Sequence, residues 1–294
     1  MACRWTLRNS AGEGLEFTEP FFLRESDGMG LPDPGYIVAT DSGLDGALVI
    51  GGYAQERRLQ FALELYAASP SELAQMRDRL YSLLADFSRE CTLRCTREDG
   101  TVREIAVRYA GNLTMPVKAG EVQSQSVVLS LVAHSPWPYD PEETIWLFGL
   151  PPGVEQFGFP LNFPVSFGSG GLEASTTRTY AGQIPCYPVI EAYGPMTGLV
   201  IRNITTGEKL DLSSYHLEVG RMLSFNLNQR FKTVTLDDGT LLTGYLSADS
   251  DLGTFHLEAH PKAWRGVNEL SVQASGCTSN SFIRFRFHTL YAGF

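Results

Sequence analysis

The segment Tyr187–Leu227 limits most strongly what this chain can fold into, because its apolar residues recur at every second position. A period of two is typical of β-strands that have one face on a core and the other in water. Residues that favour turns separate the alternating runs. The segment therefore predicts four or five short strands in succession. The runs are 189–193, 199–202, 210–212 and 223–227, and the turns between them contain Gly194-Pro195, Thr206-Gly207 and Gly220.

The same alternation continues toward the end of the sequence. In 282–288, Arg284 and Arg286 alternate with Ile283 and Phe285. Asp237-Asp238-Gly239 is typical of a further hairpin turn. We predict that this half of the chain is an antiparallel β-sandwich of eight or more strands without a helix. Its additional strands are expected at 233–236, 240–243, 252–257, 269–274 and 282–288.

Runs typical of strands also fill the first half of the sequence. In 58–67, leucine and phenylalanine alternate with more polar residues, which indicates a central strand. Asp99-Gly100 lies between two alternating runs and is a strong signal for a short hairpin. The predicted strands are 3–9, 58–67, 91–97, 102–109 and 125–133.

One helix is predicted in this half, at about 70–87. Ser69 and Glu72 form a capping box, and Pro70 occupies the first turn, where its missing N–H costs nothing. Apolar residues then recur at spacings of three and four, which predicts one stripe that packs on a sheet. The first half is therefore expected to be a sheet or split β-sandwich with a single helix. The stripe consists of Leu73, Met76, Leu80, Leu83, Leu84 and Phe87.

Residues 24–46 differ from their surroundings in composition. They hold five glycines, five acidic residues and two prolines around a short apolar island at Tyr36–Val38. A segment of this kind cannot bury itself against its own domain. Two hypotheses follow: a mobile loop, or an extended arm that lies on another molecule.

A proline-rich segment divides the sequence. Pro136, Pro138 and Pro141 are followed by Pro151-Pro152, and prolines at this density stiffen a connector and interrupt strands. A chain of 294 residues is long enough for two domains, although one large β domain also fits. We predict domains at 1–138 and 139–294.

Charge and cysteine placement restrict the function further. A net charge of −10 repels phosphates, which disfavours a protein that reads nucleic-acid sequence. No stretch resembles a signal peptide or a membrane span, so membrane insertion is not expected. Cys91 and Cys95 are expected ~13 Å apart on one face of a strand, too far for a disulfide or a shared zinc ion. All the cysteines, Cys3, Cys91, Cys95, Cys186 and Cys277, are predicted to be buried, reduced thiols.

No catalytic, cofactor or metal site is predicted. His256 and His260 are four residues apart, but Pro261 disfavours the helix that would bring them together. The sequence contains no HExxH, GxSxG or phosphate-loop motif. A glycosidase needs two carboxylates about 5–10 Å apart. The sequence of an acidic β protein singles out no such pair, so a hydrolase stays open as an alternative.

Trp264 is the candidate for a glycan contact. It stands beside Arg265 and near His260 and Asn268, which are residue types that sugar sites use. The alternatives are packing at a sheet edge or a contact between the two domains.

Three segments carry a resemblance to a known family. The first combines a proline-led strand, the Gly194-Pro195 corner, Ile201-Arg202-Asn203 and Thr205-Thr206-Gly207-Glu208. The others are Ser135–Pro141 and Gly266–Leu270. In their order and spacing they resemble the distal tail protein of siphophages, the phage tail-component family. One departure is Asn226, where the family often has an acidic residue.

The resemblance implies an N-terminal domain that forms a hexameric ring and a galectin-like C-terminal domain. It implies a structural, non-enzymatic role without a cofactor, at the distal end of the tail in the virion, after assembly in the host cytoplasm. The expected partners are the tail tube, tail-tip hub and tape measure proteins and a receptor-binding protein, with DNA passing through unread. A carbohydrate-binding module for host-surface glycans and a cell-wall hydrolase are the alternatives. The predicted arm would reach a neighbouring copy through Met29, Leu31, Tyr36, Ile37, Val38 and Leu44.

Overall fold

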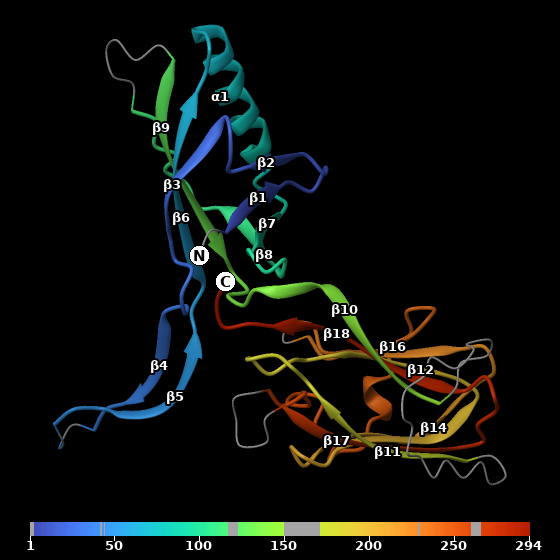
Figure 1. The fold of residues 1–294 in the computed structure, drawn as a ribbon. Coiled ribbons are helices and arrows are strands. Elements are labelled where there is room, and N and C mark those ends of the chain that lie inside the picture. Colours follow the sequence, from blue (N-terminus) through green and yellow to red (C-terminus); the bar gives the residue numbers. More distant parts are fainter. Residues whose placement is uncertain are drawn as a thin grey trace. The chain divides into compact units, whose positions relative to one another are not determined.

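The computed structural model describes residues 3–41, 43, 45–116, 123–149, 171–228, 230–259 and 266–294. Most of the described residues lie in strands, and the pairs that these strands form are antiparallel. The prediction of a mainly β chain is thus confirmed (Figure 1). The α-helix in the described residues, α1 (Pro70–Leu84), lacks the length and apolar character needed to span a membrane.

The chain forms two compact units. Unit 1 consists of Met1–Pro141 together with Tyr291–Phe294, and unit 2 consists of Glu142–Leu290. The chain leaves unit 1 within strand β10 (Tyr139–Phe148) and returns after strand β18 (Phe282–Leu290). That the two halves fold as independent domains stays a prediction.

Unit 1 is built on an antiparallel sheet whose strands follow the order β2-β1-β7-β8-β9-β6-β3. Buried and more exposed residues alternate along β6 and β9, as the period of two predicted. Cys91 and Cys95 lie on the buried face of β7, as expected, and Cys186 is also buried, whereas Cys3 and Cys277 are only partly buried, contrary to the prediction. The strands are β1 (Arg4–Arg8), β2 (Gly14–Glu16), β3 (Phe21–Asp27), β6 (Arg57–Tyr66), β7 (Cys91–Thr96), β8 (Val102–Tyr109) and β9 (Ser124–Ala133).

Helix α1 begins with the capping box that the sequence predicts. The amide of Glu72 donates to Oγ of Ser69 at 3.2 Å, and the carboxylate of Glu72 accepts from the amide of Ala68 at 2.7 Å. The helix ends at Leu84, earlier than the predicted end at Phe87, whose side chain is 70% exposed. The carboxylate of Asp86 accepts from the amide and hydroxyl of Ser88, and such local bonds compete with helical pairing. The other five residues of the predicted stripe are buried.

A β-hairpin is inserted between β3 and β6. Strands β4 (Pro34–Ala39) and β5 (Leu48–Ala54) pair only with each other among the described residues, from Pro34 opposite Ala54 to Ala39 opposite Leu48 (Figure 1). We call residues 34–54 the hairpin. It corrects the bounds of the predicted arm, 24–46. Residues 24–27 belong to β3 and run alongside β6. Strand β5 was missed because Gly51-Gly52 interrupts its apolar pattern.

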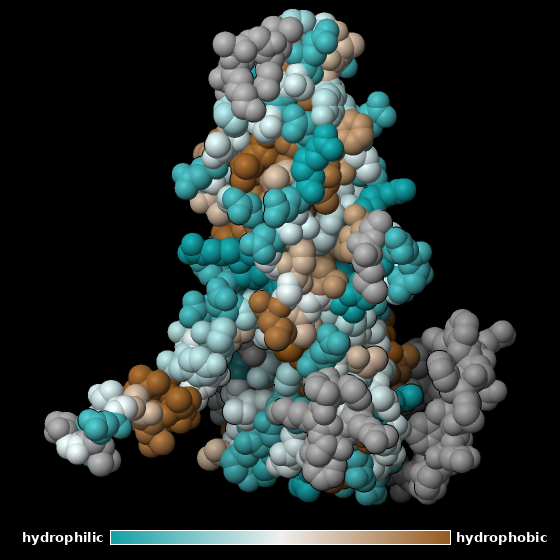
Figure 2. Space-filling model, turned by 60° about the vertical axis from the view of Figure 1, so that its left-hand side comes forward, coloured by the Kyte–Doolittle hydropathy of each residue, from teal (hydrophilic) through white to brown (hydrophobic). Residues whose placement is uncertain are grey.

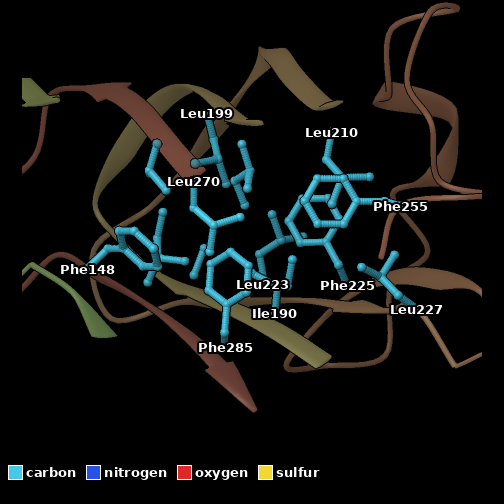
Figure 3. Packing of buried hydrophobic residues seen from close by; sticks show 14 of the residues in the cluster. Phe148, Ile190, Leu199, Leu210, Leu223, Phe225, Leu227, Phe255, Leu270 and Phe285 are labelled. Carbon is cyan, nitrogen blue, oxygen red and sulfur yellow. The ribbon is translucent and has the colours of Figure 1, made fainter. Parts of the chain in front are cut away.

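Unit 2 is an antiparallel β-sandwich, as predicted. One sheet has the order β16-β15-β12-β18-β10 and the other β11-β17-β13-β14. Aliphatic and aromatic side chains from both sheets meet between them, including Ile190 and Phe285 from one and Leu199 and Leu270 from the other (Figure 3). The remaining strands are β11 (Gly171–Thr179), β12 (Val189–Tyr193), β13 (Met196–Asn203), β14 (Glu208–Leu217), β15 (Met222–Asn226), β16 (Thr233–Leu236) and β17 (Val267–Ser275).

Two predicted strands of unit 2 are wrong. In 240–243 and 252–257, only Leu241 and Leu257 pair, each through an isolated bridge, and Thr243–Tyr245 is a 3₁₀ turn. Conversely, strand β11 was not predicted, because Glu173 to Thr179 contains few large apolar residues. Its inward positions are held by Leu172 and Ala174, which are buried. The likeness of this sandwich to galectins stays a prediction.

Candidate assembly interface

Among the described residues of unit 1, the hairpin carries the largest group of exposed apolar side chains. Figure 2 shows hydrophobic side chains gathered on it. An isolated two-stranded hairpin has no second layer against which to bury such side chains. Exposed apolar patches of this kind mark sites of association with another molecule. The side chains that are more than half exposed are Tyr36, Ile37, Val38, Leu48, Val49, Ile50 and Tyr53.

Glycines stand opposite tyrosines in the hairpin, which allows a tyrosine ring to lie close to the backbone of the paired strand. Gly35 pairs with Tyr53, and a Cβ atom at Gly35 would lie 2.5 Å from the ring of Tyr53. Gly52 pairs with Tyr36, one step along the ladder, where a Cβ atom would lie 3.7 Å from the ring of Tyr36, an ordinary contact. The ring of Tyr53 therefore lies directly over the backbone of Gly35, in space that a side chain would fill.

The structure brings together only some of the predicted arm residues. Tyr36, Ile37 and Val38 are on the hairpin, in β4. Leu31 precedes the hairpin and is 75% exposed. Met29 is half-buried and packs against the core of unit 1, because its segment lies at the root of the hairpin.

Leu44 lies outside the described residues. The role of all six candidates in assembly stays a prediction. The residues that sequence reasoning missed are those of β5, which could have been found from the run Ala47-Leu48-Val49-Ile50.

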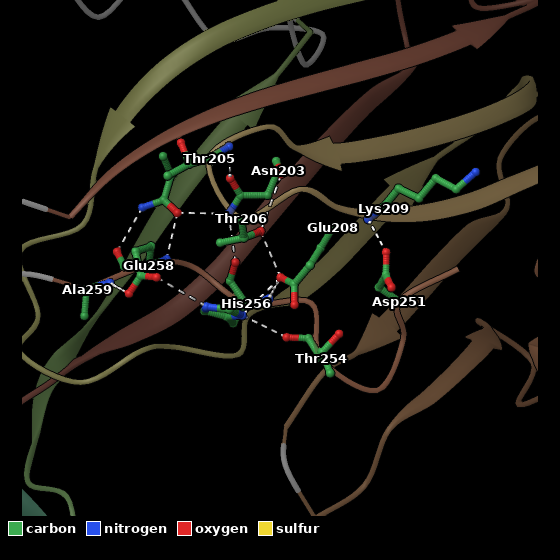
Figure 4. Close-up of polar contacts among 11 residues, drawn as sticks. Asn203, Thr205, Thr206, Glu208, Lys209, Asp251, Thr254, His256, Glu258 and Ala259 are labelled. Carbon is green, nitrogen blue, oxygen red and sulfur yellow. Dashed lines mark hydrogen bonds and ion pairs between the residues drawn. The ribbon is translucent and has the colours of Figure 1, made fainter. Parts of the chain in front are cut away.

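A second candidate site is a buried polar cluster in unit 2 (Figure 4). Asn203 and Asn268 are fully buried, and Asn203 donates to Oδ1 of Asn268 at 2.9 Å. Oδ1 of Asn268 also accepts from the amide of Glu258 at 2.7 Å, and its Nδ2 donates to the carbonyls of Glu258 and Gly266. All the bonding capacity of this amide is therefore used within the protein. Asn268, which the sequence places near the candidate glycan contact Trp264, therefore has no free polar atom for a sugar.

His256 lies between two carboxylates of the same cluster. Its Nδ1 is 3.0 Å from Oε2 of Glu208, and its Nε2 is 3.8 Å from Oε2 of Glu258. Oε2 of Glu208 also accepts from the hydroxyl of Thr206 and the amide of His256. These bonds join the turn between β13 and β14 to the segment before β17. The two carboxylates hold backbone and neighbouring side chains in place, which is a structural use of the residue types that a hydrolase needs.

The other sequence candidates for chemistry cannot be placed. Trp264 and His260 lie outside the described residues. Among the residues that are described, no group of three His, Cys, Asp or Glu side chains could hold a metal ion.

Comparisons with known proteins give a likeness of fold. No protein-family model and no curated protein matches the sequence. The structure described as SPP1 Dit, a paradigm of the hub adsorption apparatus in phages that infect Gram-positive bacteria, is similar with a TM-score of 0.64. The identity is 16%, over 97% of this chain and 98% of that chain. Two structures of the phage P2 baseplate in its activated conformation, with calcium and with strontium, each give a TM-score of 0.46 at 11% and 10% identity, covering 98% of both chains. The likeness to SPP1 Dit shows that the fold is shared over nearly the whole chain.

Proposed function

We propose that this chain is a structural, non-enzymatic subunit of a phage tail tip that associates with copies of itself into a closed ring. A hexamer is the number that the sequence resemblance implies. In this proposal the ring joins the tail tube to the hub and to receptor-binding components, and the tape measure and DNA pass through its centre. The protein is assembled in the host cytoplasm and resides at the distal end of the tail in the virion. The fold that it shares with SPP1 Dit supports this setting.

The hairpin is the observation that carries the proposal. Fully burying an aliphatic side chain stabilises by about 1.5–3 kcal/mol. Leu48, Val49 and Ile50 are each more than half exposed, so a partner that covers them gains roughly 1 kcal/mol or more from each. A hairpin that reaches from one copy to the next makes a heterologous contact, and such contacts close into a ring when the rotation between copies permits.

The structure shows how to remove the hairpin cleanly. The amide of Gln55 donates to the carbonyl of Asp33 at 2.9 Å, so the two ends of the hairpin are already adjacent. Residues 34–54 can be replaced by a short Gly-Ser turn that preserves this contact. A milder variant is Ile50→Asp, which places a charge in the exposed apolar surface. Its matched control is Val219→Asp, because Val219 is also an exposed aliphatic residue, in a loop of unit 2.

Native mass spectrometry at rising protein concentration tests the proposal. We expect the unaltered chain and Val219→Asp to form one discrete multimer, and the hairpin replacement and Ile50→Asp to remain monomeric. A ring that persists without residues 34–54 would overturn the role of the hairpin. An unaltered chain that stays monomeric at every concentration would overturn self-assembly itself.

A further inference from the structure

Arg57 is a buried cation at the first position of β6. Its side chain is only 2% exposed, yet it sits where three segments that are distant in sequence come together within unit 1. Among the described residues, its guanidinium donates to backbone carbonyls: Nε to Pro136 at 2.7 Å, Nη1 to Gly28 at 3.1 Å and to Gly30, and Nη2 to Ala292 at 2.8 Å.

These carbonyls belong to three segments that lie at different places in the chain. Gly28 and Gly30 form the root of the hairpin, Pro136 precedes the strand that leaves for unit 2, and Ala292 lies where the chain has returned. We refer to 28–30 as the root, to 133–142 as the outgoing connector and to 291–294 as the returning segment. The side chain of Arg57 therefore contacts the base of the hairpin and both segments through which the chain runs from one unit to the other.

Direct contacts reinforce the same junction. The amide of Phe294 donates to the carbonyl of Met29 in the root, and the amide of Tyr291 donates to the carbonyl of Pro138 in the outgoing connector. The ring of Phe294 packs edge-on against that of Trp5 with centroids 4.9 Å apart. The guanidinium of Arg103 lies 3.8 Å above the ring of Tyr291 and donates to the carbonyl of Gly293.

The junction is close-packed as well as hydrogen-bonded. A Cβ atom at Gly28 would lie 2.0 Å from the carbonyl oxygen of Arg58, and Gly28 has a φ of +84°. A Cβ atom at Gly293 would lie 3.1 Å from the carbonyl oxygen of Met29. The root and the returning segment thus have little room to shift independently.

A buried guanidinium makes this junction cooperative. Burial lowers the pKa of Arg57 to about 10. The charge is stabilised by the carbonyl dipoles and by the ring of Phe294, whose centroid lies 5.8 Å from the guanidinium carbon, and withdrawing one carbonyl leaves a buried N–H without its partner. Loosening of any one segment consequently weakens the hold on the other two.

We propose that Arg57 and the returning segment form a latch that couples the root of the hairpin to both passages between the units. Anything that fixes the hairpin, including contact with another molecule, then also restrains the outgoing connector and residues 291–294. The reverse holds equally, because coupling between two sites is reciprocal. The latch acts within one chain and does not depend on ring formation.

Hydrogen exchange followed by mass spectrometry on the full chain tests the latch. Arg57→Gln removes the positive charge and the guanidinium N–H groups that bind the carbonyls. Arg58→Gln at the adjacent position is the matched control, because the side chain of Arg58 is 83% exposed. We expect Arg57→Gln to accelerate exchange about tenfold or more in the root, the outgoing connector and the returning segment together, with α1 unchanged. Arg58→Gln should leave all three as they are. Acceleration confined to one segment overturns the proposal.

A variant at the far end of the latch keeps the test decisive if Arg57→Gln does not fold. Phe294→Ala keeps all the hydrogen-bond donors of Arg57 and removes the ring that packs on Trp5 and lies 5.8 Å from the guanidinium carbon of Arg57. The latch predicts faster exchange in the root, which is far away in sequence. If exchange rises only in 291–294, the returning segment is a passive tail and the proposal is wrong.

Discussion

Substitution of Asn268 by alanine offers the sharpest check on the buried cluster of unit 2. The amide of Asn268 makes four hydrogen bonds, two as acceptor and two as donor. Alanine removes all four and retains the backbone of β17. Asn203 keeps its bond to the carbonyl of His256, and Gly266 keeps the bond that it accepts from Tyr180. The amide of Glu258 loses the partner that Oδ1 provides.

The expected cost follows from these partners. A buried amide that loses its acceptor costs about 1–3 kcal/mol, and each other lost bond contributes about 0.5–1.5 kcal/mol. We therefore expect Asn268→Ala to lower the free energy of unfolding of unit 2 by about 3 kcal/mol or more, since the lower ends of these ranges already sum to about 2.5 kcal/mol. For a unit of this size, 1 kcal/mol corresponds to roughly 2–4 °C in Tm, so the drop should be at least about 6 °C.

Thermal unfolding followed by circular dichroism and by calorimetry measures this effect. The matched control is Asn228→Ala, because Asn228 is exposed and its side chain accepts only a weak local bond, from the amide of Arg230 at 3.3 Å. That variant should change the free energy of unfolding by less than about 0.5 kcal/mol. If Asn268→Ala is as mild as Asn228→Ala, the cluster is hydrated and the reasoning is refuted.

Three further predictions concern helix α1, the buried thiols and an aspartate. In urea unfolding, Leu80→Ala should lower the free energy of unfolding by about 2–5 kcal/mol and Phe87→Ala by under 1 kcal/mol. The reason is that Leu80 is fully buried, whereas Phe87 lies beyond the helix end at Leu84 and is 70% exposed. Equal losses would contradict this placement of Phe87. Burial raises the pKa of Cys186 to about 12, so very little of this thiol is ionised at pH 8, and Cys186 should resist iodoacetamide until urea is added. Hydrogen bonds from Thr240 and Arg221 hold the pKa of the Asp238 carboxyl below its ordinary value. The ionised carboxylate therefore stabilises the folded protein above the unfolded-state pKa of about 3.9, and this contribution is lost as the pH falls below that value. The Tm difference between the unaltered chain and Asp238→Asn should therefore shrink between pH 5 and pH 2, and a constant difference would show that this carboxylate is not stabilising.

The sequence predicted the structure best where the signal comes from residues that are close together along the chain. Strands β12 to β15 follow the alternating runs closely, because one face of each lies on the core of the sandwich and the other does not. The capping box likewise located the start of α1, since its donors and acceptors are three or four residues apart. Such signals are complete within a short window.

Features that depend on distant partners were not predictable in this way. Residues 24–27 are polar, yet they form a strand because β6 pairs with them. Strand β11 has few large apolar residues and is held by its pairing with β17 over nine residues. The bond between Arg57 and Ala292 joins positions 235 residues apart, and no local pattern indicates it.

The candidate interface was predictable in part. Tyr36–Val38 stood out as an apolar island among glycines and acidic residues, but its partner strand β5 did not, because two glycines break the run. The sequence also placed Asn268 near Trp264, the candidate glycan contact, as a residue type that sugar sites use. Its amide is instead consumed by backbone groups, which only the arrangement of three separate segments reveals.

The return of residues 291–294 to unit 1 has a consequence for how the molecule can be made. A nascent chain that has emerged only as far as residue 290 still lacks the carbonyl of Ala292. The hydrogen bond from Arg57 to this carbonyl therefore cannot form until the whole of unit 2 has been synthesised. For the same reason, a gene shortened after residue 141 would yield a first half with a missing piece. Because the amide of Tyr291 donates to the carbonyl of Pro138 at 2.8 Å, a first half that carries 291–294 behind residue 141 through a short linker is the recombinant form that supplies the missing segment.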